Sequence, residues 1–389
     1  MEDSEIVIVG AARTPFGKLL GSLSKVPATQ LGAHAISGAL NKNNIDADVV
    51  DAVIMGQVLQ AGCGQNPTKQ AALAAGIPAT AHTTTVNKVC LSGLSAIIDG
   101  ARLLRSGEAE MVVAGGMESM SQAPHLLPQS RAGHKYGPMT ALDHMDYDGL
   151  RAADLEISMG SLSEKYADRY PVTREEQDTA AALSHQRASA ADFSEEIVDI
   201  EVRNRKETLS VGKDEGVREG VTVDSLSKLR PAFEESGTIT AGNASPISDG
   251  AAAVVLTTRA NAAANGWKPL ATLRAVGQVA GPDSSLQAQP ANALNKALGR
   301  QGWDVEDLEV IEINEAFAAV VVHSANELGI SPDRVNAEGG AIAMGHPIGA
   351  SGARLVVHAA YKLANGAKKA GVALCGGGGQ GEALLLEGN

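Results

Sequence analysis

Short runs of apolar and β-branched residues recur along the chain and alternate with longer, alanine-rich stretches. Six of these runs have the length of buried strands, namely EIVIVG, DAVIMG, MVVAGG, AAAVVLTT, EVIEIN and GVALCGG. Between two of them, Leu91, Leu94, Ile98 and Ala101 recur at the spacing of one helix face. Continuous apolar strands that alternate with helices are typical of a sheet covered on both faces, so the pattern predicts an α/β fold.

The chain also resembles itself. When the sequence is laid on itself, Gly93 aligns with Gly352, and Gly107 aligns with Gly366 at the same offset. Each copy therefore has the order turn, helix, glycine, strand, glycine, and DAVIMGQ likewise resembles LEVIEIN upstream. This matched order predicts an internal duplication with two similar α/β halves.

The segment between the two copies is richer in proline, histidine, methionine and charge. Thr173, followed three residues later by Glu176, forms a capping-box pattern that predicts the start of a helix. Long connections of this kind are uncommon unless they form a lid or a binding segment. We therefore predict an N-terminal half at 1–119 plus 245–268, an inserted subdomain at 120–244 and a C-terminal half at 269–389.

Composition and charge narrow the class of protein. A formal net charge of -13 disfavours nucleic acid or an anionic membrane as a partner, because phosphates repel such a surface. Three cysteines among 389 residues are too few for a disulfide framework and lack the spacing of a zinc site. The N-terminal apolar run is too short for a signal peptide or a membrane span. We expect a cytoplasmic protein without a metal site.

Cys90 lies where a predicted strand, TTTVNKV, meets a predicted helix that begins with LSGLSAI. Free N–H groups and the positive end of a helix dipole favour a thiolate. We therefore expect a depressed pKa for Cys90 and a role as nucleophile. Position alone leaves open the alternative of a buried, structural cysteine.

His346 lies between an expected glycine-rich strand end and a helix expected to begin near Ala350. Pro347 and the neighbouring glycines would hold the imidazole on a rigid turn, where it could act as base for a thiol. A histidine that merely caps a turn is the alternative. The repeat favours the functional role, because His346 and Cys90 precede equivalent helices of the two halves.

Two further strand ends carry groups that could take part in chemistry. Cys375 precedes four glycines, whose N–H groups can converge on a ligand oxygen, and its thiol could move protons. The same run matches G-x-G-x-x-G, but too little chain follows for a dinucleotide fold, so we reject that interpretation. Asn314 follows a predicted strand, where its amide could bind water or an oxyanion, or simply cap a helix.

Taken together, VCLSG, NEAF, GHP and CGGGG, with GNASPISDGAAA between them, resemble the thiolase family. The resemblance extends over essentially the whole chain. It implies a thiolase-like fold with two similar five-layered α/β halves and an inserted loop subdomain. It also implies an acyltransferase that converts two acetyl-CoA molecules to acetoacetyl-CoA and coenzyme A. Coenzyme A would be a co-substrate, no cofactor would be tightly bound, and the family is commonly a homotetramer, a dimer of dimers.

The resemblance assigns a role to each reactive group. Cys90 would be the acylated nucleophile, and His346 would activate it. Cys375 would act as acid and base at the α-carbon and at the leaving thiol. Asn314 would hold the water of one oxyanion hole, and the N–H groups of Cys90 and Gly377 would form the other.

The resemblance also places coenzyme A on the inserted subdomain. Arg218 and Ser225 match positions that contact its nucleotide end. A guanidinium suits phosphate, although an exposed charge that only aids solubility is the alternative for Arg218. Ser245 matches a residue near the pantetheine.

Two departures from the family pattern bear on the substrate. Met159 fits a wall that limits acyl length, but Ser158 stands where short-chain members usually have histidine, and Pro246 replaces a smaller residue after NAS. A degradative 3-ketoacyl-CoA thiolase of broader chain length is therefore an alternative. Other classes left open are a non-catalytic acyl-CoA binding protein on this fold and a cysteine hydrolase that uses Cys90 and His346.

Overall fold

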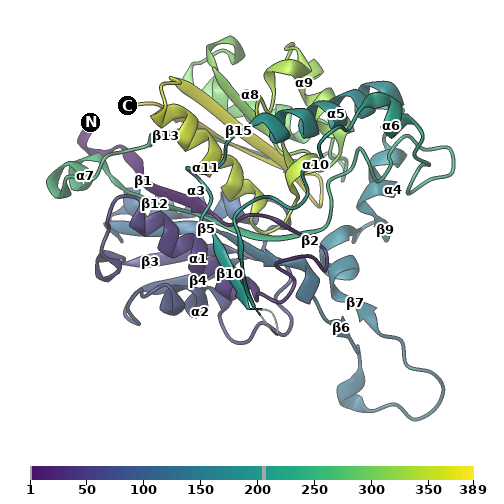
Figure 1. The fold of residues 1–389 in the computed structure, drawn as a ribbon, viewed down its shortest axis with the longest axis horizontal. Coiled ribbons are helices and arrows are strands. Elements are labelled where there is room, and N and C mark those ends of the chain that lie inside the picture. Colours follow the sequence, from purple (N-terminus) through teal and green to yellow (C-terminus); the bar gives the residue numbers. More distant parts are fainter. Residues whose placement is uncertain (1, 204–206) are drawn as a thin grey trace.

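The computed structural model describes residues 2–203 and 207–389, and most of its strands belong to one large sheet (Figure 1). The strands of this sheet are β1 Ile6–Arg13, β2 Gly17–Lys18, β3 Ala52–Gly56, β4 His82–Val86, β5 Met111–Ser119, β12 Ser248–Thr258, β13 Ala271–Ala280, β14 Val310–Ile313, β15 Lys369–Gly376 and β16 Gln380–Glu387. Their order is β14-β15-β16-β13-β1-β12-β5-β3-β4, with β2 beside β12. All six predicted runs are strands, whereas β13 and β16 were not predicted.

The two parts of the sheet repeat one pairing pattern. In the N-terminal part, β3 is parallel to β5, and β5, β12 and β1 then pair antiparallel in turn. In the C-terminal part, β14 is parallel to β15, and β15, β16 and β13 follow antiparallel. The parts join between β1 and β13 through Val7 paired with Thr272 and Ile8 paired with Ala271. This repetition agrees with the predicted duplication, to which β4 adds an extra edge strand.

Helices cover both faces of each half. Their bounds are α1 Ala28–Asn41, α2 Pro67–Ala74, α3 Ser92–Ser106, α7 Arg259–Asn265, α8 Gln289–Gln301, α9 Ala318–Glu327, α10 Ala341–Met344 and α11 Ser351–Ala364. Shorter turns are η1 Glu2–Ser4, η2 Ala47–Val49, η3 Met120–Gln122, η4 Ser130–Ala132, η5 Met145–Leu150, η6 Val305–Asp307 and η7 Pro332–Arg334. Across 2–203 and 207–389, no helix combines the length and the apolar character needed to cross a bilayer.

Alternate residues of the strands enter different cores, as the period of a strand requires. Val112 and Val254 point into a central core with α3 and α11, whereas Val113 and Val255 point into an outer core with α1. On the other half, α8 packs on β13 and β16. The molecule therefore has five layers. The N-terminal and C-terminal parts of the sheet form two of them, α3 and α11 pack together between these parts, and the other helices form the two outer layers. This packing brings the N-termini of α3 and α11 side by side.

The inserted segment lies between β5 and β12, outside the large sheet. It contains β6 His125–Leu126, β7 Leu142–Asp143, β8 Arg151–Ala152, β9 Ile157–Ser158, α4 Met159–Lys165, α5 Arg174–Ala190, β10 Ile200–Arg203, β11 Thr208–Val211 and α6 Val223–Ser227. The predicted capping box is confirmed, because the Thr173 N–H donates to the Glu176 carboxylate at 2.7 Å and the Thr173 side chain accepts the Glu176 N–H. Beyond β6 and β7, residues 127–141 protrude as an arm (Figure 1).

Candidate active site

Cys90 lies on a tight turn between β4 and α3, as predicted. The preceding Val89 has φ of 50°, a left-handed conformation that is unusual for a β-branched residue. Bonds within the turn hold this conformation. The Val89 N–H donates to Asn87 Oδ1 at 3.0 Å, and Ser92 Oγ accepts the Lys88 N–H at 2.8 Å and donates to the Val89 carbonyl at 2.6 Å. The strained turn therefore fixes the direction of the thiol.

His346 lies on the turn between α10 and α11. The segment before it is the short helix α10, so the predicted strand end was wrong; Gly345, at φ 126°, ends this helix. Ring atom Nδ1 of His346 lies 2.5 Å from Ser351 Oγ, and the Ser351 hydroxyl donates to the Pro347 carbonyl at 3.0 Å. The serine oxygen thus accepts from Nδ1–H, which leaves Nε2 as the unprotonated nitrogen.

The two turns meet at one cavity of about 470 Å³. Cys90 and His346 reach the cavity from these turns, and Cys375 reaches it from β15, just before the glycine run. Residues that line the cavity include Cys90, Ser158, Met159, Phe233, Ser245, Pro246, Phe317, His346, Cys375 and Gly377. The structure therefore brings together the three reactive side chains that the sequence predicted.

Burial controls the protonation of these groups. Although Cys90 keeps some surface toward the cavity, burial of its sulfur raises the pKa of Cys90 to about 11, and the N–H groups of Gly377 and Cys90 only partly oppose this rise. The predicted depression of the pKa was wrong, because lost hydration of the thiolate outweighs the helix terminus. Burial also raises the pKa of Cys375, and the nearby Cys90 raises it further. Burial lowers the pKa of His346 to about 4. At neutral pH the site holds two thiols and a neutral imidazole.

Asn314 follows β14 and lies beside the imidazole. Its Nδ2 is 3.4 Å from Nε2 of His346, and its backbone N–H donates to the Ala373 carbonyl at 3.0 Å. Among the described residues, its buried Oδ1 has no hydrogen-bond partner. A buried acceptor without a partner is suited to an ordered water.

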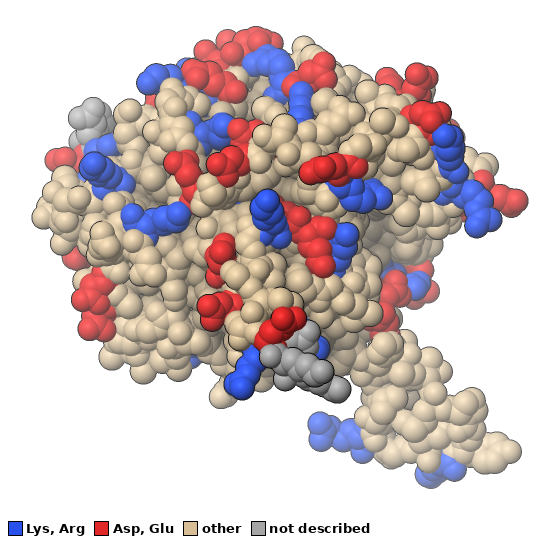
Figure 2. All heavy atoms as spheres, in the orientation of Figure 1, with Lys and Arg blue, Asp and Glu red and all other residues tan. Residues whose placement is uncertain are grey.

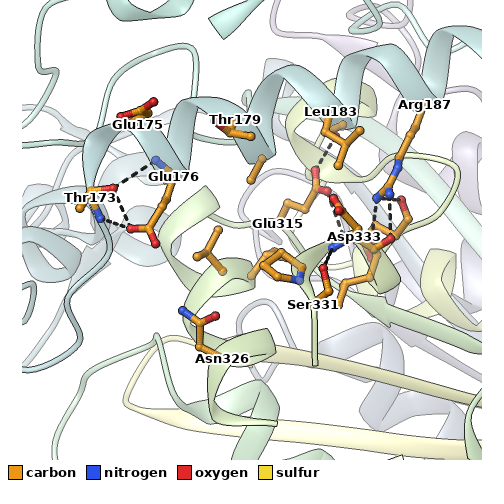
Figure 3. Close-up of a pocket in the computed structure, with 17 residues that line it drawn as sticks. Thr173, Glu175, Glu176, Thr179, Leu183, Arg187, Glu315, Asn326, Ser331 and Asp333 are labelled. Carbon is orange, nitrogen blue, oxygen red and sulfur yellow. Dashed lines mark hydrogen bonds between the residues drawn. The ribbon is translucent and has the colours of Figure 1, made fainter. Parts of the chain in front are cut away.

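Glu315 holds the short helix that leads to His346, a role that the sequence did not reveal. Its carboxylate accepts the Ile342 N–H at 2.9 Å in α10, together with Ser184 Oγ at 2.7 Å and Asn336 Nδ2 at 2.9 Å. Figure 3 shows Glu315 beneath α5, at a second cavity that the reactive side chains do not line. An acidic residue between Asn314 and an apolar run was the signal that could have pointed to it.

The remaining predicted residues fall into two groups. Met159 and Ser245 line the cavity with Cys90, and Ser245 Oγ donates to the Ala316 carbonyl at 3.0 Å. Arg218 and Ser225 do not line it; Arg218 Nη2 lies 3.2 Å from a ring nitrogen of His185. Within 2–203 and 207–389, no group of three or more His, Cys, Asp or Glu is placed to hold a metal ion.

Family models match nearly the whole chain. The model of the thiolase N-terminal domain matches residues 6–260, and the model of the thiolase C-terminal domain matches residues 267–388. The gap between them, residues 261–266, covers most of α7, which follows the first pairing repeat of the sheet.

Relatives align over the same length. The chain is 54% identical over 386 residues to the probable acetyl-CoA acetyltransferase of Mycolicibacterium smegmatis. The aligned residues cover 98% of this chain and 100% of that protein. Identity to the probable acetyl-CoA acetyltransferase of Mycobacterium tuberculosis is also 54%, over 98% of each chain. It is 46% to the acetyl-CoA acetyltransferase of Chromobacterium violaceum, over 98% of this chain and 99% of that one. Since both domains and their full length match, the chain belongs to the thiolase family.

Proposed function

We propose that this thiolase catalyses the reversible reaction of two acetyl-CoA molecules to acetoacetyl-CoA and free coenzyme A. The observation that carries the proposal is the single cavity shared by Cys90, His346 and Cys375. The names of the relatives, acetyl-CoA acetyltransferases, support acetyl as the transferred group. A binding protein without catalysis would not need two thiols and an imidazole at one cavity.

In the first step, the Cys90 sulfur attacks the thioester carbonyl while its proton passes to Nε2 of His346. Burial favours the neutral form of both groups, so the step begins from a thiol and a neutral imidazole, and the proton moves as the carbon–sulfur bond forms. The bond from the carbonyl carbon to the coenzyme A sulfur breaks, and Cys375 gives its proton to that sulfur. The N–H groups of Cys90 and Gly377 stabilise the carbonyl oxygen.

In the second step, the Cys375 thiolate removes a proton from the methyl group of a second acetyl-CoA. The resulting carbanion attacks the acetyl carbonyl on Cys90, and a carbon–carbon bond forms as the carbon–sulfur bond breaks. The departing sulfur takes back the proton held by His346. We assign a water held by Asn314, together with His346, to the oxygen of the second thioester; the partnerless Oδ1 of Asn314 supports this assignment.

We place coenzyme A along the inserted subdomain, 120–244, which would serve as lid and binding surface. Met159 would close the acyl end and Ser245 would contact the pantetheine, since both line the cavity with the reactive thiol. Arg218 and Ser225, which do not line that cavity, would contact the nucleotide end of this long co-substrate. Coenzyme A would act as co-substrate, without a tightly bound cofactor.

A second candidate is a 3-ketoacyl-CoA thiolase of broader chain length. It is favoured by Ser158, whose small side chain lines the cavity where a larger residue would shorten it. The ratio kcat/KM for thiolysis across a series of 3-ketoacyl thioesters separates the two. A maximum at acetoacetyl-CoA supports the first candidate, and a rise with chain length supports the second.

We further propose a cytoplasmic homotetramer that serves fatty acid metabolism. The arm at 127–141 exposes Leu127, Tyr136 and Met139, and Figure 2 shows basic but no acidic side chains on it. A second copy of this acidic chain, with net charge -13, would suit such an arm. Free Cys63, Cys90 and Cys375 fit a reducing compartment. Light scattering should give the mass of a tetramer, and the mass of a monomer would contradict the assembly.

The intact mass of the protein after mixing with acetyl-CoA tests the reaction. We expect one acetyl group on the wild type, its loss when free coenzyme A is added, and no acetyl group on Cys90→Ala. Cys63→Ala is the matched control and should still be acetylated, because Cys63 does not line the cavity. Hydrolysis of acetyl-CoA without transfer to an acceptor would instead support a cysteine hydrolase.

A further substitution separates the two steps. Cys375→Ser keeps a group of similar size with a much less acidic proton, so it should lower condensation by roughly 10² to 10⁴-fold and lower α-proton exchange in deuterated buffer to a similar degree. Acetylation of Cys90 should still be detected by mass. Condensation at the wild-type rate would remove Cys375 from the mechanism.

A further inference from the structure

Glu118 is a fully buried carboxyl group near the end of β5 that the proposed reaction does not use. Its two oxygens accept three backbone N–H groups, from Val58 at 3.0 Å, Leu59 at 3.1 Å and Gly349 at 2.9 Å. Removing a carboxylate from water is costly, and charge-assisted bonds of this kind offset part of that cost. Burial raises the pKa of Glu118 to about 7, and the three N–H groups only partly oppose this rise. The carboxyl group thus stands at a place where an apolar residue would be easier to bury.

The three N–H groups come from different halves of the molecule. Val58 and Leu59 follow β3 after one intervening residue, in the N-terminal half. Gly349 lies three residues after His346, in the turn that opens α11 of the C-terminal half. Glu118 therefore joins the His346 turn to the opposite half through direct hydrogen bonds.

Packing around Gly349 leaves this turn little freedom. A Cβ atom at Gly349 would lie 2.6 Å from Oε2 of Glu118. A Cβ atom at Gly116 of β5 would lie 2.0 Å from the Gly349 carbonyl oxygen, and one at Gly93 of α3 would lie 2.9 Å from it. The turn packs closely against β5 and α3, and the Glu118 carboxylate is the polar contact that β5 makes with Gly349.

The same region reaches the nucleophile. Cys90 packs against an apolar cluster formed by Val58, Leu59, Met120 and Ile348. Two of these residues donate to Glu118, and Ile348 lies in the His346 turn. The bonds of Glu118 thus hold in place residues that pack against Cys90.

We propose that Glu118 is a positioning residue that sets the distance between His346 and Cys90 by fixing the His346 turn of one half against the other half. The inference rests on the proposed roles of Cys90 and His346. Glu118 touches neither substrate nor reacting atoms in this account and acts through the backbone of the turn.

Glu118→Gln tests the proposal, because it keeps the shape but replaces one accepting oxygen with an NH₂ group that faces a backbone N–H. We expect acetylation of Cys90 and kcat for thiolysis to fall about tenfold or more, with KM for coenzyme A within about twofold of the wild type. In a His346→Ala background the same substitution should have little further effect, since the distance no longer matters.

Asp51→Asn is the matched control. The Asp51 carboxylate also accepts two N–H groups, from Glu110 at 2.8 Å and Met111 at 3.0 Å, but at the opposite end of β3 and β5. It should lower stability without slowing acetylation of Cys90. If Glu118→Gln does not fold, Glu118→Asp, one methylene shorter, enters the same comparison.

Equal fold losses with and without His346, or a wild-type acetylation rate for Glu118→Gln, would overturn the proposal. Alkylation of Cys90 by iodoacetamide in the same set of variants needs no thioester. Loss of the Glu118 charge alone would lower the pKa of Cys90 and speed this reaction. Slowing by Glu118→Gln that is seen with His346 present and not with His346 absent would therefore report the position of the imidazole. A wild type that takes up no acetyl group would refute the proposed function, while the alkylation rates would still decide whether Glu118 acts through His346.

Discussion

The turn that carries Cys90 and the turn that carries His346 are fixed in different ways. Backbone groups of the first are bonded within residues 87–92. The side chain of Lys88, in the same turn, also reaches the other half and forms an ion pair with Glu382 of β16 at 2.5 Å. The backbone geometry of the nucleophile is nevertheless mainly a property of six neighbouring residues.

The turn of the base depends on distant parts of the chain. The His346 N–H lies 3.2 Å from Ser248 Oγ of β12, and the turn that follows donates to Glu118 of β5. Both strands belong to the N-terminal half, although His346 belongs to the C-terminal half. The difference teaches that the nucleophile is formed locally, whereas the base is placed only when the two halves dock.

Removing the base gives the largest effect on this comparison. His346→Ala should slow acetylation of Cys90 by roughly 10² to 10⁴-fold, because the thiol loses its proton acceptor, while coenzyme A binding changes little. Rapid-quench measurement of the acetyl-enzyme checks the rate. His34→Ala, at an exposed position of α1, is the control and should match the wild type. Equal rates in His346→Ala and wild type would exclude His346 as the base.

The protonation states of Cys90 and His346 in the free protein can be determined from the pH dependence of Cys90 alkylation. Because burial raises the pKa of Cys90 to about 11, the thiolate is a small fraction at pH 7 and grows as the pH rises. The rate of Cys90 alkylation by iodoacetamide should therefore increase about tenfold per pH unit between about pH 7 and 9. The measurement is made in a Cys63→Ala background. A flat profile would indicate a preformed thiolate–imidazolium pair.

The tautomer of the base can be disturbed without removing the ring. Ser351→Ala deletes the oxygen that accepts from Nδ1 of His346, which lies 2.5 Å away. The imidazole can then carry its proton on either nitrogen, and acetylation should slow by about tenfold. Ser351→Thr keeps the hydroxyl and should restore most of the rate. Slowing in both variants to the same degree would point to packing rather than to the hydrogen bond.

The strain of the nucleophile turn should have the smallest effect. Val89→Gly relieves the left-handed conformation at φ 50°. We expect the free energy of unfolding to rise by about 0.5 to 1 kcal/mol, since glycine's greater chain entropy offsets part of the relief. Acetylation should slow about threefold, because the thiol direction is less restricted. Urea denaturation at fixed protein concentration checks stability, and a decrease would show that Val89 is not strained.

Strands were predicted where the sequence has an unbroken apolar or β-branched run, and two were missed for different reasons. β5 and β12 are buried on both faces and read as unbroken apolar runs. β13 is only partly buried and includes Arg274 and Gln278, so its alternating pattern was overlooked. β16 follows the glycine run directly and has Glu382 buried within it. Its place in the sheet depends on partners that the local sequence does not show.

The same limit applies to the candidate site. Cys90, His346 and Cys375 were found because each lies beside a strand end, a glycine or a proline that local patterns reveal. The bond from Gly349 to Glu118 joins positions separated by 231 residues, and no local pattern marks it. The pKa of Cys90 was predicted in the wrong direction for the same reason, because burial depends on the whole fold.

The two parts of the sheet join where β1 pairs with β13, and these strands lie far apart in the sequence. This separation has a consequence for synthesis on the ribosome. The N-terminal half cannot complete its part of the sheet until β12 has emerged, and the base emerges nearly a hundred residues later, at position 346. Domains generally fold as units, beginning with the N-terminal one, so a nascent chain presents its nucleophilic cysteine without the imidazole. Cys90 would therefore become reactive toward cellular thioesters only after the C-terminal strands have left the ribosome. An unfinished chain would thus not be acylated and trapped as a fragment.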